Sequence, residues 1–151
     1  MNRARFALAA LLVTGIGSWS GHLAAADLDP KAITIQLPKD IKWTKGNGSE
    51  QAILVGDPSK PGMYVVLTKW LPHNNSRPHF HPNDRYITVL SGTWWVNTGP
   101  QYDPEGMKPV PAGSFVTHFA KEVHYDGAKD VECILEIVGI GPAMSTQAAA
   151  P

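Results

Sequence analysis

The sequence lacks a second cysteine. Cys133 is the only cysteine in the 151 residues, so no disulfide can form within one chain, and stability must come from packing. It lies in the apolar run from Val131 to Ile137. A buried apolar residue is the main interpretation of Cys133, and a thiolate ligand or nucleophile is the alternative.

The sequence also lacks an excess of charge of either sign. Its 13 basic residues are balanced by 13 acidic ones. It contains no basic cluster of the kind that binds nucleic acid, and no positive run that would hold it on an anionic membrane surface. We therefore expect a small-molecule ligand or substrate as its partner.

No apolar run is long enough to cross a bilayer. The longest, Phe6 to Ile16, follows the basic start at Arg3 and Arg5 and precedes the small residues 24–26. These three parts are typical of a secretory signal peptide over residues 1–26, which predicts a periplasmic or secreted protein with no stable membrane anchor. A membrane anchor or an unstructured leader is the alternative. Cleavage would leave 11 basic and 13 acidic residues, a net charge of about −2.

After residue 26, no window has a helical period sustained over three turns. Instead, many prolines and glycines separate short segments rich in β-branched and aromatic residues. We expect strands at 32–37, 41–43, 51–55, 63–71, 79–90, 93–96, 114–118, 121–124 and 131–138. The strands ending at Leu90 and starting at Thr93 are predicted to form a tight hairpin through Gly92. This spacing is typical of a sandwich or small barrel.

The segment His79-Phe80-His81 is the strongest functional signal. Side chains two residues apart point to the same face of an extended chain, so both imidazoles can approach one cation. In a helix the two rings would diverge. Pro78 and Pro82 favour extended backbone in the residues before them. The pattern therefore predicts a metal-binding element in a β-protein.

The spacing of these histidines resembles the cupin family. The first cupin motif is Gly, five residues, His-x-His, three residues, Glu, six residues, Gly, and here His79, His81 and Gly92 stand at matching places. The second motif is Gly, five residues, Pro-x-Gly, two residues, His, three residues, Asn. Gly113 and His124 match it. The resemblance covers roughly residues 60–138 and suggests a small single-domain bacterial cupin with a signal peptide.

Five motif positions depart from the pattern. His73 stands at the first glycine, Arg85 at the acidic ligand, Phe119 and Lys121 at the proline and glycine of the second motif, and Ala128 at the final asparagine.

The resemblance implies an all-β fold, a small antiparallel β-barrel of the cupin or jelly-roll type, with the metal inside. We assign residues 27–140 to this domain and residues 141–151 to a flexible C-terminal tail. Because cupins often dimerise through N-terminal strands, residues 27–45 are expected to be able to exchange between the subunits of a homodimer.

We predict His79, His81 and His124 as the metal ligands. Three neutral imidazoles suit a divalent transition metal such as Fe, Zn, Mn, Ni, Co or Cu, with an open position for water or substrate. The alternative is that these histidines have structural or surface roles.

Arg85 conflicts with a cation bound nearby. A guanidinium about 6 Å from a divalent ion is repelled by about 5–6 kcal/mol at an effective dielectric of about 20, and arginine does not lose its proton. Arg85 can pair with an acid such as Asp84, Asp103 or Glu132. It can instead stay in the pocket as a catalytic residue that clamps an anionic substrate. The third outcome is a site without metal.

Other residues are weaker candidates. His118 and His73 could line the cavity or its rim or face solvent. Four aromatic side chains could wall the pocket or belong to an ordinary core or surface: Tyr86, Tyr125, Trp94 and Trp95.

Three functions stay open at this stage. The first is an exported three-histidine metalloenzyme with oxygenase-like or other small-molecule chemistry, as the resemblance implies. The second is a non-catalytic cupin that binds a small ligand with Arg85 as the anion anchor. The third is a structural or storage role.

Overall fold

The computed structural model describes residues 28–149, so the predicted signal peptide lies outside the described residues. The chain divides into a unit of residues 1–35 and a unit of residues 36–151. Within the described part of the first unit, a turn forms where Ala32 N donates to Asp29 O at 2.9 Å. All the elements named below belong to the second unit. No helix among residues 28–149 has the length and apolar character needed to cross a membrane.

Twelve strands and one short 3-10 helix make up the described residues of the second unit. They are η1 (Pro38–Asp40), β1 (Thr44–Lys45), β2 (Ser49–Val55), β3 (Gly62–Trp70), β4 (Asn74–Asn75), β5 (His79–Phe80), β6 (Arg85–Ser91), β7 (Thr93–Thr98), β8 (Lys108–Pro111), β9 (Phe115–His118), β10 (His124–Ala128), β11 (Cys133–Gly141) and β12 (Thr146–Gln147).

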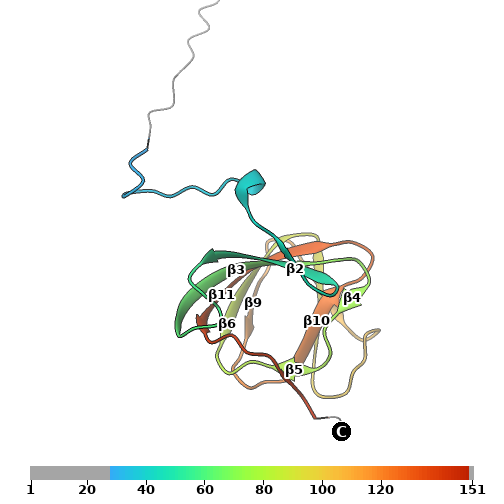
Figure 1. The fold of residues 1–151 in the computed structure, drawn as a ribbon. Helices are drawn as coiled ribbons and strands as arrows, with labels where there is room; N and C mark the ends of the chain where they lie inside the picture. Colours follow the sequence, from blue (N-terminus) through green and yellow to red (C-terminus); the bar gives the residue numbers. More distant parts are fainter. Residues whose placement is uncertain (1–27, 150–151) are drawn as a thin grey trace, which may run out of the picture. The chain divides into compact units, whose positions relative to one another are not determined.

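The strands form two antiparallel sheets. One has the order β1-β2-β3-β11-β6-β9, and the other has the order β12-β5-β10-β7-β8, with β4 also paired to β10. The sheets face each other across the interior (Figure 1). The predicted all-β class and jelly-roll type are confirmed by this arrangement.

The core lies between the sheets because alternate residues of β3, β6 and β11 point inward. It comprises Tyr64, Val66, Ile87, Val89, Trp94, Ala128, Cys133, Leu135 and Ile137. Cys133 is free and fully buried, and burial raises the pKa of its thiol to about 12. It therefore serves as a small apolar core residue, in agreement with the main interpretation of the sequence.

Several local predictions were wrong. No strand forms at residues 32–37 or 41–43. The predicted strand 79–90 is divided: β5 belongs to one sheet and β6 to the other, with Pro82 in the connecting segment. The predicted hairpin through Gly92 is also absent, because β6 and β7 lie in different sheets. The turn at Gly92 instead carries the chain from one sheet to the other.

Gly92 is required at this corner for two reasons. Its φ is +72°, a conformation that residues with a Cβ rarely adopt. A Cβ at this position would also lie 2.2 Å from the carbonyl oxygen of Glu132, which is backbone and cannot rotate away. The neighbouring strand therefore fixes the path of the corner.

We predict that Gly92→Ala lowers the free energy of unfolding by about 3 kcal/mol or more, because backbone strain and a steric clash act together. Gly113→Ala is the matched control: its φ is +88°, but nothing lies within 4 Å of the added Cβ. The control should lose only about 1 kcal/mol. Urea unfolding of the two variants measures the difference, and equal losses would show that the clash at Gly92 is relieved.

Candidate metal centre

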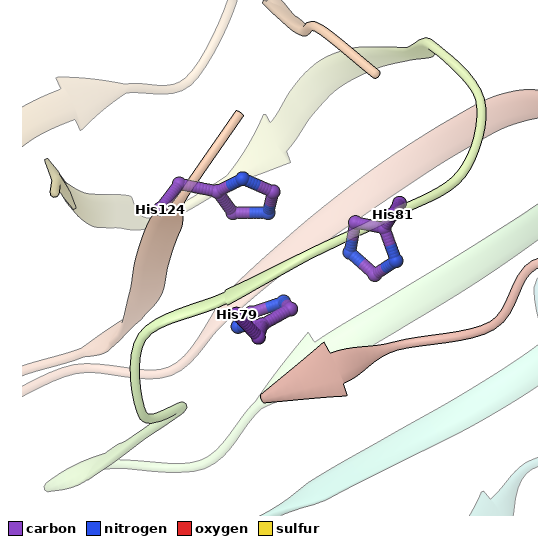
Figure 2. A group of neighbouring side chains, drawn as sticks. All are labelled: His79, His81 and His124. Atoms are coloured by element: carbon purple, nitrogen blue, oxygen red, sulfur yellow. The ribbon is translucent and has the colours of Figure 1, made fainter. Parts of the chain in front are cut away.

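Three histidines meet inside the molecule: His79 on β5, His81 directly after β5, and His124 on β10. β10 pairs antiparallel with β5 at a single register position, His124 opposite His79, and His81 follows two residues after His79. The ring centroids are 4.6 Å apart for His79 and His124, 4.9 Å for His79 and His81, and 5.2 Å for His81 and His124. Each residue is at most 6% exposed. Figure 2 shows the three rings around a common space.

Each of these imidazoles uses its Nδ1 to contact a backbone carbonyl. The acceptors are the oxygens of Arg77 for His79 (2.8 Å), Met144 for His81 (2.8 Å) and Glu122 for His124 (3.0 Å). A carbonyl only accepts hydrogen bonds, so Nδ1 carries the proton in all three rings, and each Nε2 keeps its lone pair. This is the tautomer of a metal-bound histidine whose other nitrogen is held by the protein.

The spacing of the ring nitrogens fits a metal ion. One ligating nitrogen from each of the three rings lies within 4.8 Å of the other two. Ligands about 2.1 Å from a tetrahedral ion are about 3.4 Å apart, so a small ring movement would bring them to ligand distance. His124 Nε2 is buried and has no hydrogen-bond partner within the described residues. A bound cation would satisfy this otherwise unpaired lone pair.

Burial keeps the rings of His81 and His124 neutral. It lowers the pKa of His81 to about 3, with the charge of Arg85 acting in the same direction. It lowers the pKa of His124 to about 4, assisted by His79. Since a cation binds only the unprotonated imidazole, no proton has to be removed from these two rings near neutral pH.

Arg85 remains at the site. It begins β6, and its Nη1 donates a hydrogen bond to Nε2 of His81. Its Nε is buried without a partner in the described part of the chain. Arg85 forms no salt bridge within residues 28–149, and Asp84 instead accepts the Ala120 N–H at 2.7 Å. Of the outcomes considered for Arg85, pairing with an acid is therefore not the one observed.

A cavity of about 320 Å³ adjoins His79, His81 and Arg85. Its apolar wall consists of Trp70, Ile87, Trp94, Leu135 and Ile137. Its polar wall includes Ser49, Gln51, Thr68, Ser76, Arg77, Ser145 and Gln147. This size and mixed lining suit a small organic molecule.

The segment after β11 also contributes to the site. The sequence analysis expected a flexible tail from residue 141. In the structure, β12 pairs with β5, with Gln147 opposite His79, and the Met144 carbonyl orients His81. These residues thus form part of the wall around the histidines.

Asp126 is a site residue that the sequence analysis missed. It lines the cavity, is 7% exposed, and lies two residues after His124 on the same face of β10. Burial raises its pKa, while His79 and Arg85 act in the opposite direction. The available sequence signal was that Asp126 lies two residues after His124. This signal identifies Asp126 only when β10 is known to continue beyond residue 124.

His118 lies behind His124 rather than in the cavity wall. Its ring centroid is 3.7 Å from that of His124 and 5.3 Å from that of Trp94. It is 8% exposed, its Nδ1 has no partner among the described residues, and burial lowers its pKa to about 2. His118, His124 and Asp126 form a second group of ligand atoms within 4.8 Å of one another.

The remaining candidates have different positions. His73 is exposed and, with Trp95, lines a separate surface cavity. Tyr86 is 46% exposed, and Tyr125 is fully buried, with its hydroxyl accepting a hydrogen bond from Asp103 N. Trp94 is the one of the four candidate aromatic residues that lines the cavity.

Solved structures with the same architecture are numerous, although no protein-family model and no curated protein matches the sequence. One is the polyketide cyclase RemF from Streptomyces resistomycificus, with a TM-score of 0.65, 16% identity, and 79% of this chain and 87% of that chain covered. A protein with a double-stranded β-helix domain from Klebsiella pneumoniae has a TM-score of 0.58, 18% identity and coverages of 76% and 96%. Rru_A2000 from Rhodospirillum rubrum, a cupin-2 domain, has a TM-score of 0.58, 13% identity and coverages of 78% and 80%. The chain has the cupin fold that the spacing of its histidines and glycines predicted.

We predict that the metal-free protein loses stability as the pH falls below about 6.5. In the folded protein, the pKa values of His81, His118 and His124 lie below the usual value of a histidine. Their contribution to the free energy of unfolding is therefore complete above pH 6.5 and is lost as the pH falls toward these lowered pKa values. Each such histidine contributes a slope of up to about 1.4 kcal/mol per pH unit.

Urea unfolding at pH 7, 6 and 5 measures this slope. His118→Phe removes one buried titrating group that lies outside the three-histidine group, so its slope should be shallower by up to about 1.4 kcal/mol per pH unit. An identical slope in this variant would mean that His118 is protonated in the folded protein as readily as in the unfolded chain.

Proposed function

We propose that the protein binds one divalent transition-metal ion through His79, His81 and His124 and acts on a small anionic substrate. The observation that carries the proposal is the buried, unpartnered Nε2 of His124, which lies among two other imidazoles of the same tautomer. An ion held by three imidazoles keeps open positions and supplies a Lewis acid that can polarise a substrate oxygen.

The cavity and Arg85 support a small anion as the substrate. Arg85 presents a half-buried guanidinium that forms no salt bridge within the described chain, and its buried, unpartnered Nε–H can donate a hydrogen bond to one oxygen of a carboxylate. Tryptophans and aliphatic residues form one wall of this cavity of about 320 Å³ and can pack against the apolar part of a small substrate. In this arrangement Arg85 orients the substrate beside the histidines.

The similar polyketide cyclase indicates that this fold can carry an enzyme active site, whereas the reaction of the present chain is not fixed by that likeness. Residues 1–26 and the resemblance to cupins add two further proposals: the protein acts in the periplasm or outside the cell, and it forms a homodimer through residues 27–45.

Metal binding is tested on protein that has been expressed from the full sequence, with its leader, and recovered from the periplasm. The recovered mature chain should begin at Asp27. We predict close to one equivalent of a transition metal after reconstitution with Fe, Zn, Mn, Ni, Co or Cu. His79→Ala and His124→Ala should each weaken binding by at least about 100-fold, because two imidazoles replace three. His73→Ala, an exposed histidine outside the cavity, is the control.

Metal content by mass spectrometry and affinity by calorimetry measure both effects. Less than about 0.1 equivalent of bound metal per chain in the unsubstituted protein, with every metal tried, would contradict the proposal. Unchanged affinity in His79→Ala would place the ion elsewhere.

A second function is favoured by one observation: Arg85 occupies the acidic position of the motif and hydrogen-bonds the lone pair of His81 that an ion would need. The protein would then be a non-catalytic cupin that holds a small anion. The two functions differ in how Arg85 affects the metal and the anion.

We predict that Arg85→Ala has opposite effects on the two ligands. Zinc should bind at least about 10-fold more tightly, because a repelling charge and a competing donor to His81 are removed. Benzoate binding to the metal-free protein should become about 10-fold weaker or undetectable. Arg85→Lys, which keeps the charge but loses the planar fork, should recover little benzoate binding.

Calorimetry with zinc and with benzoate separates the cases. Benzoate binding that depends on Arg85, with no metal bound by any variant, would favour the non-catalytic function. Benzoate binding that is indifferent to Arg85 would contradict its role as the anion anchor in both.

A further inference from the structure

Asp126 is a buried carboxylic acid that the three-histidine site does not use. It lies on β10 and is 7% exposed, and it forms no salt bridge within the described residues. An isolated carboxylate away from water costs several kcal/mol unless opposite charges or hydrogen bonds offset it. The groups that favour its charged form are His79, Arg85 and the Ser76 hydroxyl. All three also line the cavity.

The charge balance of the proposed site lacks an anion. A divalent ion and Arg85 together carry three positive charges, whereas the three imidazole ligands are neutral. The motif position that carries an acid in cupins is Arg85 in this chain. Among the described residues that line the cavity, Asp126 is the only one with a carboxylate.

Asp126 shares a neighbour, His124, with His79 and His81. Ligand atoms of His79, His81 and His124 form one close group, and those of His118, His124 and Asp126 form another. The two groups share His124. Its Nδ1 is occupied by the Glu122 carbonyl, so Nε2 is the nitrogen left to bind an ion. One nitrogen lone pair binds one ion. Because both groups include this residue, an ion bound by His124 would lie near the ligand atoms of both.

His118 fits this role less well than Asp126. Its ring packs against Trp94 and His124. It also carries no charge to offset that of an ion. Asp126 has both the access and the charge.

We infer that Asp126 is the fourth protein ligand of the metal, and that β10 supplies from this position the carboxylate that β6 does not supply from position 85. The inference rests on the proposed metal site. It assigns the ion a ligand set of three imidazole nitrogens and one carboxylate oxygen. This set lowers the charge that Arg85 experiences, so Arg85 can remain in the cavity beside a cation.

Asp126→Asn tests the inference, because the amide keeps the shape of the side chain but loses the charge. Zinc affinity from calorimetry should fall by about 10- to 100-fold. The visible spectrum of the cobalt-loaded protein should change, since the anionic oxygen ligand is lost. Glu136→Gln is the matched control. Glu136 lies on β11 between Leu135 and Ile137, whose side chains line the cavity. Its own side chain points to the opposite face of the sheet, away from the cavity. It should leave the affinity and the spectrum unchanged.

Misfolding is checked by thermal unfolding of the metal-free protein. Asp126→Asn should be at least as stable as the unsubstituted chain, because it replaces a buried ionisable group with a neutral one. If Asp126→Asn binds zinc as tightly as Glu136→Gln and has the same cobalt spectrum, the inference is overturned and the three-histidine site stands. If the unsubstituted protein binds no metal, the proposed function and the inference both fail.

Discussion

The candidate site depends on one antiparallel register position, where His124 of β10 lies opposite His79 of β5. A shift of one residue in this pairing would turn His124 to the other face of its sheet and separate the rings. β5 has only two residues and is too short to fix its own register. The register is instead held by its neighbours, because β10 also pairs with β7 over four positions and β12 pairs with the far edge of β5.

The second requirement is that buried imidazoles keep their lone pairs directed at one point. Desolvation favours the neutral form, and the carbonyls of Arg77, Glu122 and Met144 decide which nitrogen keeps the proton. Two of these carbonyls lie two residues before the histidine that they orient, so they are placed by local chain geometry. The third comes from 63 residues along the chain. The segment after β11 is therefore part of the mechanism that orients His81.

The sequence predicted the parts of the site that depend on local spacing. His79, His81, His124, Gly92 and Gly113 stand at the spacings of two cupin motifs, and the all-β class followed from the absence of a helical period. The sequence could not show which sheet each strand joins, because pairing partners are distant in the chain. β6 and β7 were therefore taken as a hairpin, although they belong to different sheets.

Asp126 was missed for a related reason. Its side chain matters only because β10 continues past His124 and turns residue 126 toward the cavity, whereas the predicted strand ended at residue 124. Met144 gives no sequence signal at all, since it contributes through its backbone carbonyl and any residue type could supply that group.

In the proposed function, Arg85 would link the binding of the anion to that of the metal ion. Nε2 of His81 has one lone pair, which cannot accept the Arg85 hydrogen bond and bind a cation at the same time. A carboxylate that engages the guanidinium releases this nitrogen and adds a negative charge beside it. Anion and cation therefore favour each other's binding, and by linkage each raises the affinity of the other by the same factor. In the proposed function, an arginine at the acidic position, which is unfavourable for metal binding alone, would couple occupancy of the metal site to the presence of an anionic substrate.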